Sequence, residues 1–311
     1  MNLLNFQLLI GNDLLTNFVD NMDVYFIMIV ALAFLAIGDL VVGVSNDAVN
    51  FLNSALGSKA ISVRKIMILA SLGVLVGSVF SSGMMEVARK GIFNPEMLLF
   101  SEIMIIFMAV MITDILLLDF FNTLGLPTST TVSIVFELLG AAVAVSLIKI
   151  SGLGSEFGDL VNYINVEKAS QIILGILLSV FIAFSVGALV QFIARTLLSY
   201  NYEQKSKWVG SVFGGVALTS ISYFILMKGI KGTSFAKESY DLLDGATISS
   251  FLETEVFMIS LISFVLLSLI SYILIFSFRV NIYKLIIGVG TFSLALAFAG
   301  NDLVNFIGVP I

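Results

Sequence analysis

Amide and carboxylate side chains gather on one face of a predicted helix in the first sixth of the chain. The polar positions recur at spacings of three and four, which places them on a single helical face; they are Asp39, Gly43, Asn46, Asp47, Asn50, Asn53 and Ser54. The oxygen atoms of Asn46 and Asp47 are hard ligands that suit Na⁺ or another hard cation. The stripe therefore predicts a cation site. The alternative is that the amides only hydrogen-bond neighbouring helices to each other.

The same pattern returns near the other end of the chain. Residues 44–51 read VSNDAVNF and residues 299–306 read AGNDLVNF, so five positions match at a constant offset. The second copy adds Asn301 and Asp302 as candidate cation ligands. Seven predicted membrane crossings separate the copies, so we expect their helices to run in opposite directions. Inverted repeats with polar or broken helices are typical of secondary transporters.

A cluster of hydroxyl side chains follows Pro127 in the segment PTSTTVS, residues 127–133. Proline favours the first helical turn and makes the preceding residue extended, so the segment predicts a helix N-terminus. The N–H groups and positive dipole end there, together with several hydroxyl groups, suit an oxyanion. An ordinary capped helix start is the alternative. The short turn at residues 121–124 lies between two long apolar runs, which predicts a re-entrant or broken helical element.

The elements that must position these motifs are membrane helices. The 311 residues are 59% hydrophobic and 12% charged, with a mean hydropathy of +1.09, which excludes an ordinary water-soluble globular domain. A membrane span needs about 20 apolar residues, and about eight such runs are present. They cover residues 24–44, 66–82, 98–119, 127–148, 170–194, 208–228, 255–278 and 285–309. We therefore expect an all-α polytopic protein of the cell membrane.

The ionisable residues narrow the chemistry further. The chain has no His and no Cys, so no imidazole proton relay or thiol chemistry is available. Its net charge of −6, with no basic stripe, predicts no nucleic-acid partner. Five acids lie within apolar runs, where each must be protonated, hydrogen-bonded or neutralised by a cation; they are Asp39, Asp47, Asp114, Glu137 and Asp302.

The distribution of Lys and Arg weakly favours a topology with the N-terminus outside. In that topology the short inside loops hold the following residues: Lys59, Arg64, Lys65, Arg195, Lys205, Lys207, Arg279 and Lys284. Short loops are those for which the positive-inside rule counts. Residues 1–10 lack the basic start of a secretory signal peptide, so we expect no cleaved leader.

The three motifs, in this order, resemble those of the PiT family of inorganic phosphate transporters. The hallmark of that family is a duplicated G-A-N-D-V-A-N-A motif, each copy followed downstream by P-x-S-T-T-H-S. Residues 44–51, 127–133 and 299–306 match these motifs, and Gly-Ser-Lys-Ala at residues 57–60 also fits the family. The resemblance runs from about residue 24 to the end.

The resemblance implies a cation-coupled symporter that carries phosphate with Na⁺ or H⁺ and needs no other cofactor. It implies phosphate contacts from Thr128, Ser129, Thr130 and Thr131, with Asn50 and Asn305 helping to organise the two ligands. A homodimer is a further expectation.

Four features depart from the family pattern. Val132 and Phe298 stand where histidines are usual, and Val44 and Ser45 replace Gly-Ala. The chain also stops at Ile311, before a second hydroxyl motif, so we expect the second repeat to be incomplete. The expected organisation is an N-terminal segment (1–23), a first repeat (24–200), connecting helices (201–284) and the start of the second repeat (285–311).

The sequence leaves three other functions open. A sulfate or other oxyanion permease of the same fold would use the same helix N-terminus, and an uncoupled or incomplete membrane fragment would not accumulate its substrate. Intramembrane hydrolysis by paired aspartates, such as Asp39 with Asp114, is the enzymatic alternative. The segment Ile37-Gly38-Asp39 lacks the second glycine of the Gly-x-Gly-Asp pattern, so we expect no enzyme.

Overall fold

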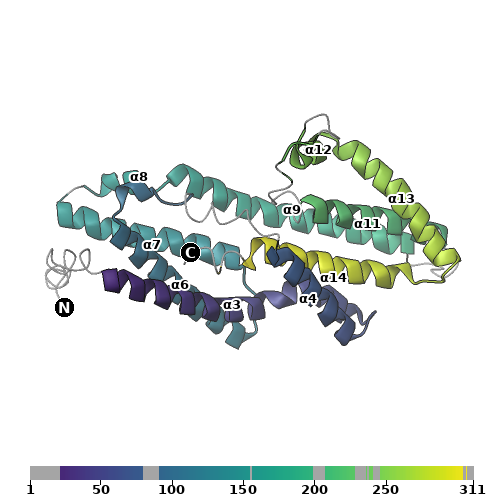
Figure 1. Ribbon diagram of the computed structural model, residues 1–311, viewed down its shortest axis with the longest axis horizontal. Coiled ribbons are helices and arrows are strands. Elements are labelled where there is room, and N and C mark those ends of the chain that lie inside the picture. The colour runs from purple at the N-terminus through teal and green to yellow at the C-terminus, as the bar shows by residue number, and fades with distance from the viewer. Residues whose placement is uncertain are drawn as a thin grey trace. The chain divides into compact units, whose positions relative to one another are not determined.

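The structure, a computed structural model, is helical along most of its described length (Figure 1). It describes residues 22–79, 91–154, 156–198, 207–227, 236, 238–240, 246–303 and 306. Eight long helices lie within these residues: α3 (Met22–Ser58), α4 (Val63–Val79), α6 (Phe100–Leu124), α7 (Thr130–Leu153), α9 (Val166–Leu198), α11 (Trp208–Ile225), α13 (Val256–Phe276) and α14 (Ile282–Asn301). The short helices are η1 (Pro95–Met97), η2 (Phe157–Asp159), α8 (Leu160–Tyr163) and α12 (Ile248–Thr254).

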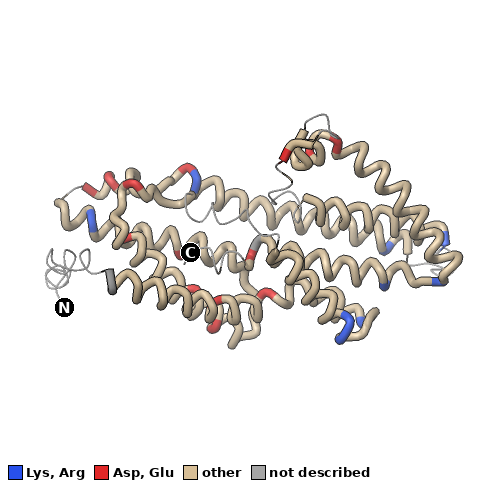
Figure 2. Tube along the Cα trace, viewed as in Figure 1, with Lys and Arg blue, Asp and Glu red and all other residues tan. Residues whose placement is uncertain are grey.

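Seven of the long helices are apolar and long enough to cross a membrane. The eighth, α4, has 17 residues and is the shortest of the long helices. Charged residues are sparse along all of them, and many lie near their ends (Figure 2). The prediction of an all-α polytopic membrane protein is confirmed, and the chain is a multi-pass integral membrane protein.

The chain divides into two compact units that share α3 and α9. Unit 1 comprises residues 1–47, 84–176 and 305–311, and unit 2 comprises residues 48–83 and 177–304. The boundary in α3 follows Asp47, so Asn46 and Asp47 of the first motif copy belong to unit 1, whereas Phe51, which is also buried, belongs to unit 2.

Unit 1 is built around the antiparallel pair α6 and α7. Its core joins residues of both helices to Leu32 of α3 and to the loop residues Ile92 and Phe93. The N–H of Asn94 donates to the carbonyl oxygen of Tyr163 at 2.8 Å, which ties this loop to α8. The packed helices give the motif residues a fixed frame.

The predicted interruption between the third and fourth apolar runs is present at residues 125–129. Gly125 ends α6 with a φ of 67°, a left-handed conformation that glycine adopts without steric cost. Its N–H donates to the carbonyl oxygen of Asn122 at 3.0 Å. Ser129 then caps α7, since its side chain accepts a hydrogen bond from the N–H of Val132. The hydroxyl motif therefore lies at the N-terminus of α7, as the proline predicted.

Unit 2 contains two closely packed helix pairs, α4 with α14 and α11 with α13. Gly73 lies against Phe292, and Gly77, one turn later, lies against Leu296, so α4 and α14 run in the same direction. The close approach depends on the missing side chains at these two glycines, as in other membrane helix pairs.

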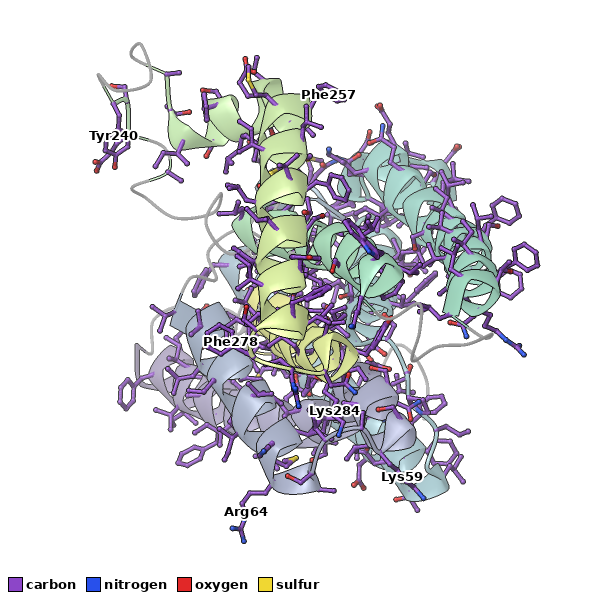
Figure 3. The ribbon with its side chains drawn as sticks, turned by 90° about the vertical axis from the view of Figure 1, so that its right-hand side faces the viewer. Lys59, Arg64, Tyr240, Phe257, Phe278 and Lys284 are labelled. Atoms are coloured by element: carbon purple, nitrogen blue, oxygen red, sulfur yellow. The ribbon has the colours of Figure 1, made fainter. Side chains whose placement is uncertain are left out.

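Basic residues at or just before the starts of α4 and α14 lie at the same end of unit 2, because the two helices are parallel. Lys59, Arg64 and Lys284 are labelled in Figure 3, which looks onto this end. Figure 3 also shows Phe257 and Phe278 at the two ends of α13. The N-terminal end of α13, where Phe257 lies, directly follows α12.

Candidate functional site

The side chain of Asn46 holds the turn that leads into the hydroxyl motif. Its Nδ2 donates to Oδ1 of Asn122 at 2.9 Å and to the carbonyl oxygen of Leu126 at 3.2 Å. Its Oδ1 accepts the N–H of Thr128 at 2.7 Å. Nδ2 of Asn122 in turn donates to the carbonyl oxygen of Val42 at 3.0 Å. The Asn46 side chain thus holds both the end of α6 and the turn before α7 against α3.

The carboxylate of Asp47 meets the hydroxyl motif directly. Oγ1 of Thr130 donates to Oδ2 of Asp47 at 3.0 Å, and both residues are buried, with 1% of Thr130 and 3% of Asp47 exposed. A hydrogen bond to a charged acceptor in a buried site is stronger than one between neutral groups. The two motifs that the sequence presents separately are therefore parts of one cluster in unit 1.

The other hydroxyl residues lie around the first turn of α7. Thr128 and Thr131 are half-buried, whereas Ser129 is exposed. The Ser129 oxygen accepts the Val132 N–H at 3.5 Å, which leaves the hydroxyl hydrogen to donate outward. The N-terminal dipole of α7 points its positive end at the same place.

A glycine before the first motif copy brings the last residue of the second copy close. A side chain at Gly43 would collide with the ring of Phe306, which is fully buried. The ring of Phe306 therefore packs directly against the α3 backbone at Gly43, just before Val44 and Ser45, two of the positions where the chain departs from the family pattern.

The rest of the second copy is described only in part. The C-terminal end of α14 is at Asn301, and the N–H of Asp302 donates to the carbonyl oxygen of Phe298 at 2.8 Å. Asp302 is half-buried. The Asn301 side chain and the whole of Asn305 lie outside the described residues. Asn50, its counterpart in the first copy, is exposed. The assignments of these residues therefore stay predictions.

Three of the acids within apolar runs come together inside unit 1. Asp39 of α3 and Asp114 of α6 are fully buried, and the carboxyl oxygens of Glu137 of α7 are buried too. Within the part of the chain that the structure describes, no group of three or more acidic side chains is arranged to hold a metal ion. Asp39 and Asp114 do meet, as paired aspartates of a hydrolase would.

Sequence reasoning missed the two residues that complete the cluster around Asn46. Asn122 was part of the predicted turn, but its side chain carried no assignment, and Leu126 contributes only a backbone carbonyl oxygen. The position of Asn122 could have indicated its role, because it is an amide residue three positions before Gly125, at the predicted interruption between two helices.

Comparison with known proteins relates the chain to phosphate permeases. It is 25% identical over 198 residues to a Thermococcus kodakarensis protein named "Putative phosphate permease TK2061", covering 60% of this chain and 44% of that protein. A Helicobacter pylori protein of similar name is 25% identical over 191 residues, covering 60% of this chain and 33% of the relative. The chain spans less than half the length of these relatives.

A solved structure named "The sodium-dependent phosphate transporter" shares the fold. Its TM-score is 0.63 at 19% identity, over 91% of this chain and 66% of that one. A model of the family described as "Phosphate transporter family" matches residues 43–311. That family is a family of transporters and not of enzymes, so the hydrolase alternative is excluded. The match covers most of the chain and includes all three motifs, and the chain therefore belongs to the phosphate transporter family.

Proposed function

We propose that this membrane protein takes part in the transport of inorganic phosphate by symport with a cation, Na⁺ or H⁺. The phosphate binds at the N-terminus of α7, where Thr128, Ser129, Thr130 and Thr131 lie, and the cation binds at Asp47. Family membership and the names of the relatives support phosphate as the substrate. The name of the structural neighbour supports a coupling cation.

The hydrogen bond from Thr130 to Asp47 is the observation that carries the proposal. A hydroxyl group has one hydrogen to donate, and in this structure the carboxylate receives it. A cation at Asp47 would neutralise the carboxylate and free the Thr130 hydroxyl to donate to phosphate. Each ligand would then raise the affinity for the other, which is the thermodynamic requirement for coupled binding.

The role of Asn46 in this scheme is to position the anion site. Its amide oxygen accepts the Thr128 N–H, so that N–H points into the turn and away from a bound anion. The proposed donors to phosphate are therefore the hydroxyl groups and the remaining N–H groups of the first turn of α7. Asn46 could still add its second lone pair to a cation beside Asp47.

Uptake of labelled phosphate tests the proposal, with the complete gene product in proteoliposomes. A Na⁺ gradient and a pH gradient are applied separately, and unlabelled phosphate or sulfate is added in excess. We expect accumulation against the phosphate gradient that unlabelled phosphate abolishes and sulfate does not. Equal competition by sulfate would identify a general oxyanion permease, and uptake without accumulation would remove the coupling.

Substitution of the two aspartates tests the cation site. Asp47→Ala and Asp302→Ala should each abolish coupled uptake while the protein still inserts into the membrane. Normal uptake in both variants would contradict the assignment of the cation site.

The homodimer stays a prediction, which a measurement of the mass of the protein in detergent would test.

A further inference from the structure

The buried acids Asp39, Asp114 and Glu137, here called the carboxyl triad, come from three different helices of unit 1. The carboxyl groups of Asp39 and Glu137 each lie within hydrogen-bonding reach of Asp114. Asp39 and Asp114 have no exposed surface. The triad is separate from the Thr130–Asp47 pair, and the proposed phosphate symport does not use it.

All six carboxyl oxygens of the triad are buried acceptors without a donor. A buried acceptor without a donor costs about 1–3 kcal/mol, and a buried charge without a partner costs more. Two ionised carboxylates cannot hydrogen-bond, because both groups only accept. A proton on one member of each pair supplies the missing donor. Two shared protons would satisfy both links and leave at most one negative charge.

No basic side chain neutralises the triad within the described residues. The charged groups that act on each member are the other members. The other charged side chains described on these three helices in unit 1 do not contact the triad. Glu102 and Lys149 form an ion pair at 2.9 Å, and Asp119 is exposed. Asp47 accepts a hydrogen bond from Thr130. A proton on a carboxyl group is both the positive charge and the hydrogen-bond donor that such a pair of carboxyl groups needs.

A groove between α6 and α7 reaches one member of the triad. It has a volume of about 600 Å³ and is lined by Glu137 together with Thr113 and Ser133. The rest of its lining is apolar, from residues such as Val110 and Phe136. Glu137 is therefore the member of the triad that lies beside this groove; its carboxyl oxygens are covered in this structure, so proton exchange requires the side chain to turn towards the groove.

We propose that the carboxyl triad is a proton-binding site that holds at least two protons and exchanges one through the groove at Glu137. A proton that leaves passes to water in the groove and leaves one carboxylate, which the two remaining protons stabilise by hydrogen bonds. In transport, which rests on the proposed function, the exchanged proton is a coupling ion.

Carbodiimide labelling of the unaltered full-length protein in membranes is the first test. Dicyclohexylcarbodiimide is apolar and adds to protonated carboxyl groups in apolar surroundings. We expect modification of Glu137, found by mass spectrometry of peptides, that declines as the pH is raised. The exposed residues Asp119 and Glu156 serve as internal controls and should stay unmodified. An unmodified Glu137 at every pH would overturn the proposal, as would protection by Na⁺ at constant pH.

Infrared spectroscopy of purified variants is the second test. Protonated carboxyl groups have a C=O stretching band that carboxylates lack. Asp114→Asn and Glu137→Gln should each lose part of this band at neutral pH, whereas the matched variant Asp119→Asn on the same helix should keep it. If Asp114→Asn does not fold, Glu137→Gln decides alone. An unchanged band in folded triad variants would overturn the proposal.

Neither measurement uses phosphate, so the proton site can fail or succeed independently of the proposed transport. Its role in coupling is tested by uptake driven by a pH gradient. We expect Glu137→Gln to reduce that uptake at least tenfold relative to Glu156→Gln. Equal uptake in the two variants would show that the triad does not take part in coupling.

Discussion

The hydroxyl group of Thr130 has one proton to donate, and Asp47 receives it in this structure. Thr130→Val keeps the shape but removes the donor, whereas Thr130→Ser keeps the donor. A hydrogen bond to a charged group contributes about 1.5–3 kcal/mol. We therefore expect Thr130→Val to weaken phosphate binding by roughly 10- to 100-fold and Thr130→Ser to change it little. Equilibrium binding of labelled phosphate measures both. Equal losses would show that shape, not the hydroxyl group, matters.

Asn46 makes three hydrogen bonds that fix the turn before α7. Asn46→Ala removes all of them, and at about 1 kcal/mol each the expected loss of stability is roughly 3 kcal/mol. The variant should unfold at a clearly lower temperature in detergent. Asn53→Ala changes the same residue type on an exposed part of α3 and should have little effect. If the two variants unfold at the same temperature, the Asn46 contacts do not hold the turn.

The residue types predicted much of the site, because hydroxyl groups and adjacent Asn and Asp residues carry recognisable chemistry. The sequence could not predict that Thr130 bonds to Asp47, since 83 positions separate them. Nor could it predict the use of the Leu126 carbonyl group, because every residue has one. Asp39, Asp114 and Glu137 were each identified as acids within apolar runs, and Asp39 was considered with Asp114 as a pair, but the meeting of all three depends on the packing of three helices.

At the scale of single helices, the absence of a side chain at Gly73 and Gly77 allows α4 to pack closely on α14. A Cβ atom at Gly77 would collide with the backbone of Leu296 and lie 2.8 Å from Cβ of Ala299. Gly77→Ala should therefore force the helices apart and destabilise unit 2 by about 1–3 kcal/mol. In contrast, a Cβ atom at Gly140 of α7 meets nothing within 4 Å. Gly140→Ala should stabilise its helix by up to about 1 kcal/mol. Thermal unfolding in detergent should separate the two variants in opposite directions.

Helix boundaries differ from the predicted segments where polar residues are buried by neighbours. Hydropathy predicted that the first segment ends at residue 44, yet α3 continues to Ser58 through the polar motif. The reason is that Asn46 and Asp47 find partners in unit 1, so the helix can carry them at low cost. The fourth segment was predicted from residue 127, but Ser129 caps α7 and the helix begins at Thr130.

For the whole molecule, the number and order of long helices follow from hydropathy, because lipid accepts only long apolar spans with satisfied backbones. The division into two units does not follow from it. The boundary lies within α3 and within α9, where the sequence continues as an uninterrupted helix. Which helices share a unit depends on side-chain packing, such as Phe51 on Phe298, with ring centroids 5.1 Å apart.

The orientation in the membrane can be tested with introduced cysteines, because the 311 residues contain none. Lys59 precedes α4, and Lys284 lies in the first turn of α14; these helices run in parallel, so both positions should be cytoplasmic by the positive-inside rule. Glu253 lies before α13 and Lys284 lies after it, at opposite ends of a span of about 30 Å. A membrane-impermeant maleimide applied to intact cells should label Glu253→Cys but not Lys59→Cys or Lys284→Cys. Permeabilised cells should allow labelling of all three. If Lys59→Cys and Lys284→Cys are labelled and Glu253→Cys is not, the topology is the opposite of the one predicted. Labelling of only one of the two lysine variants would contradict the parallel arrangement of α4 and α14.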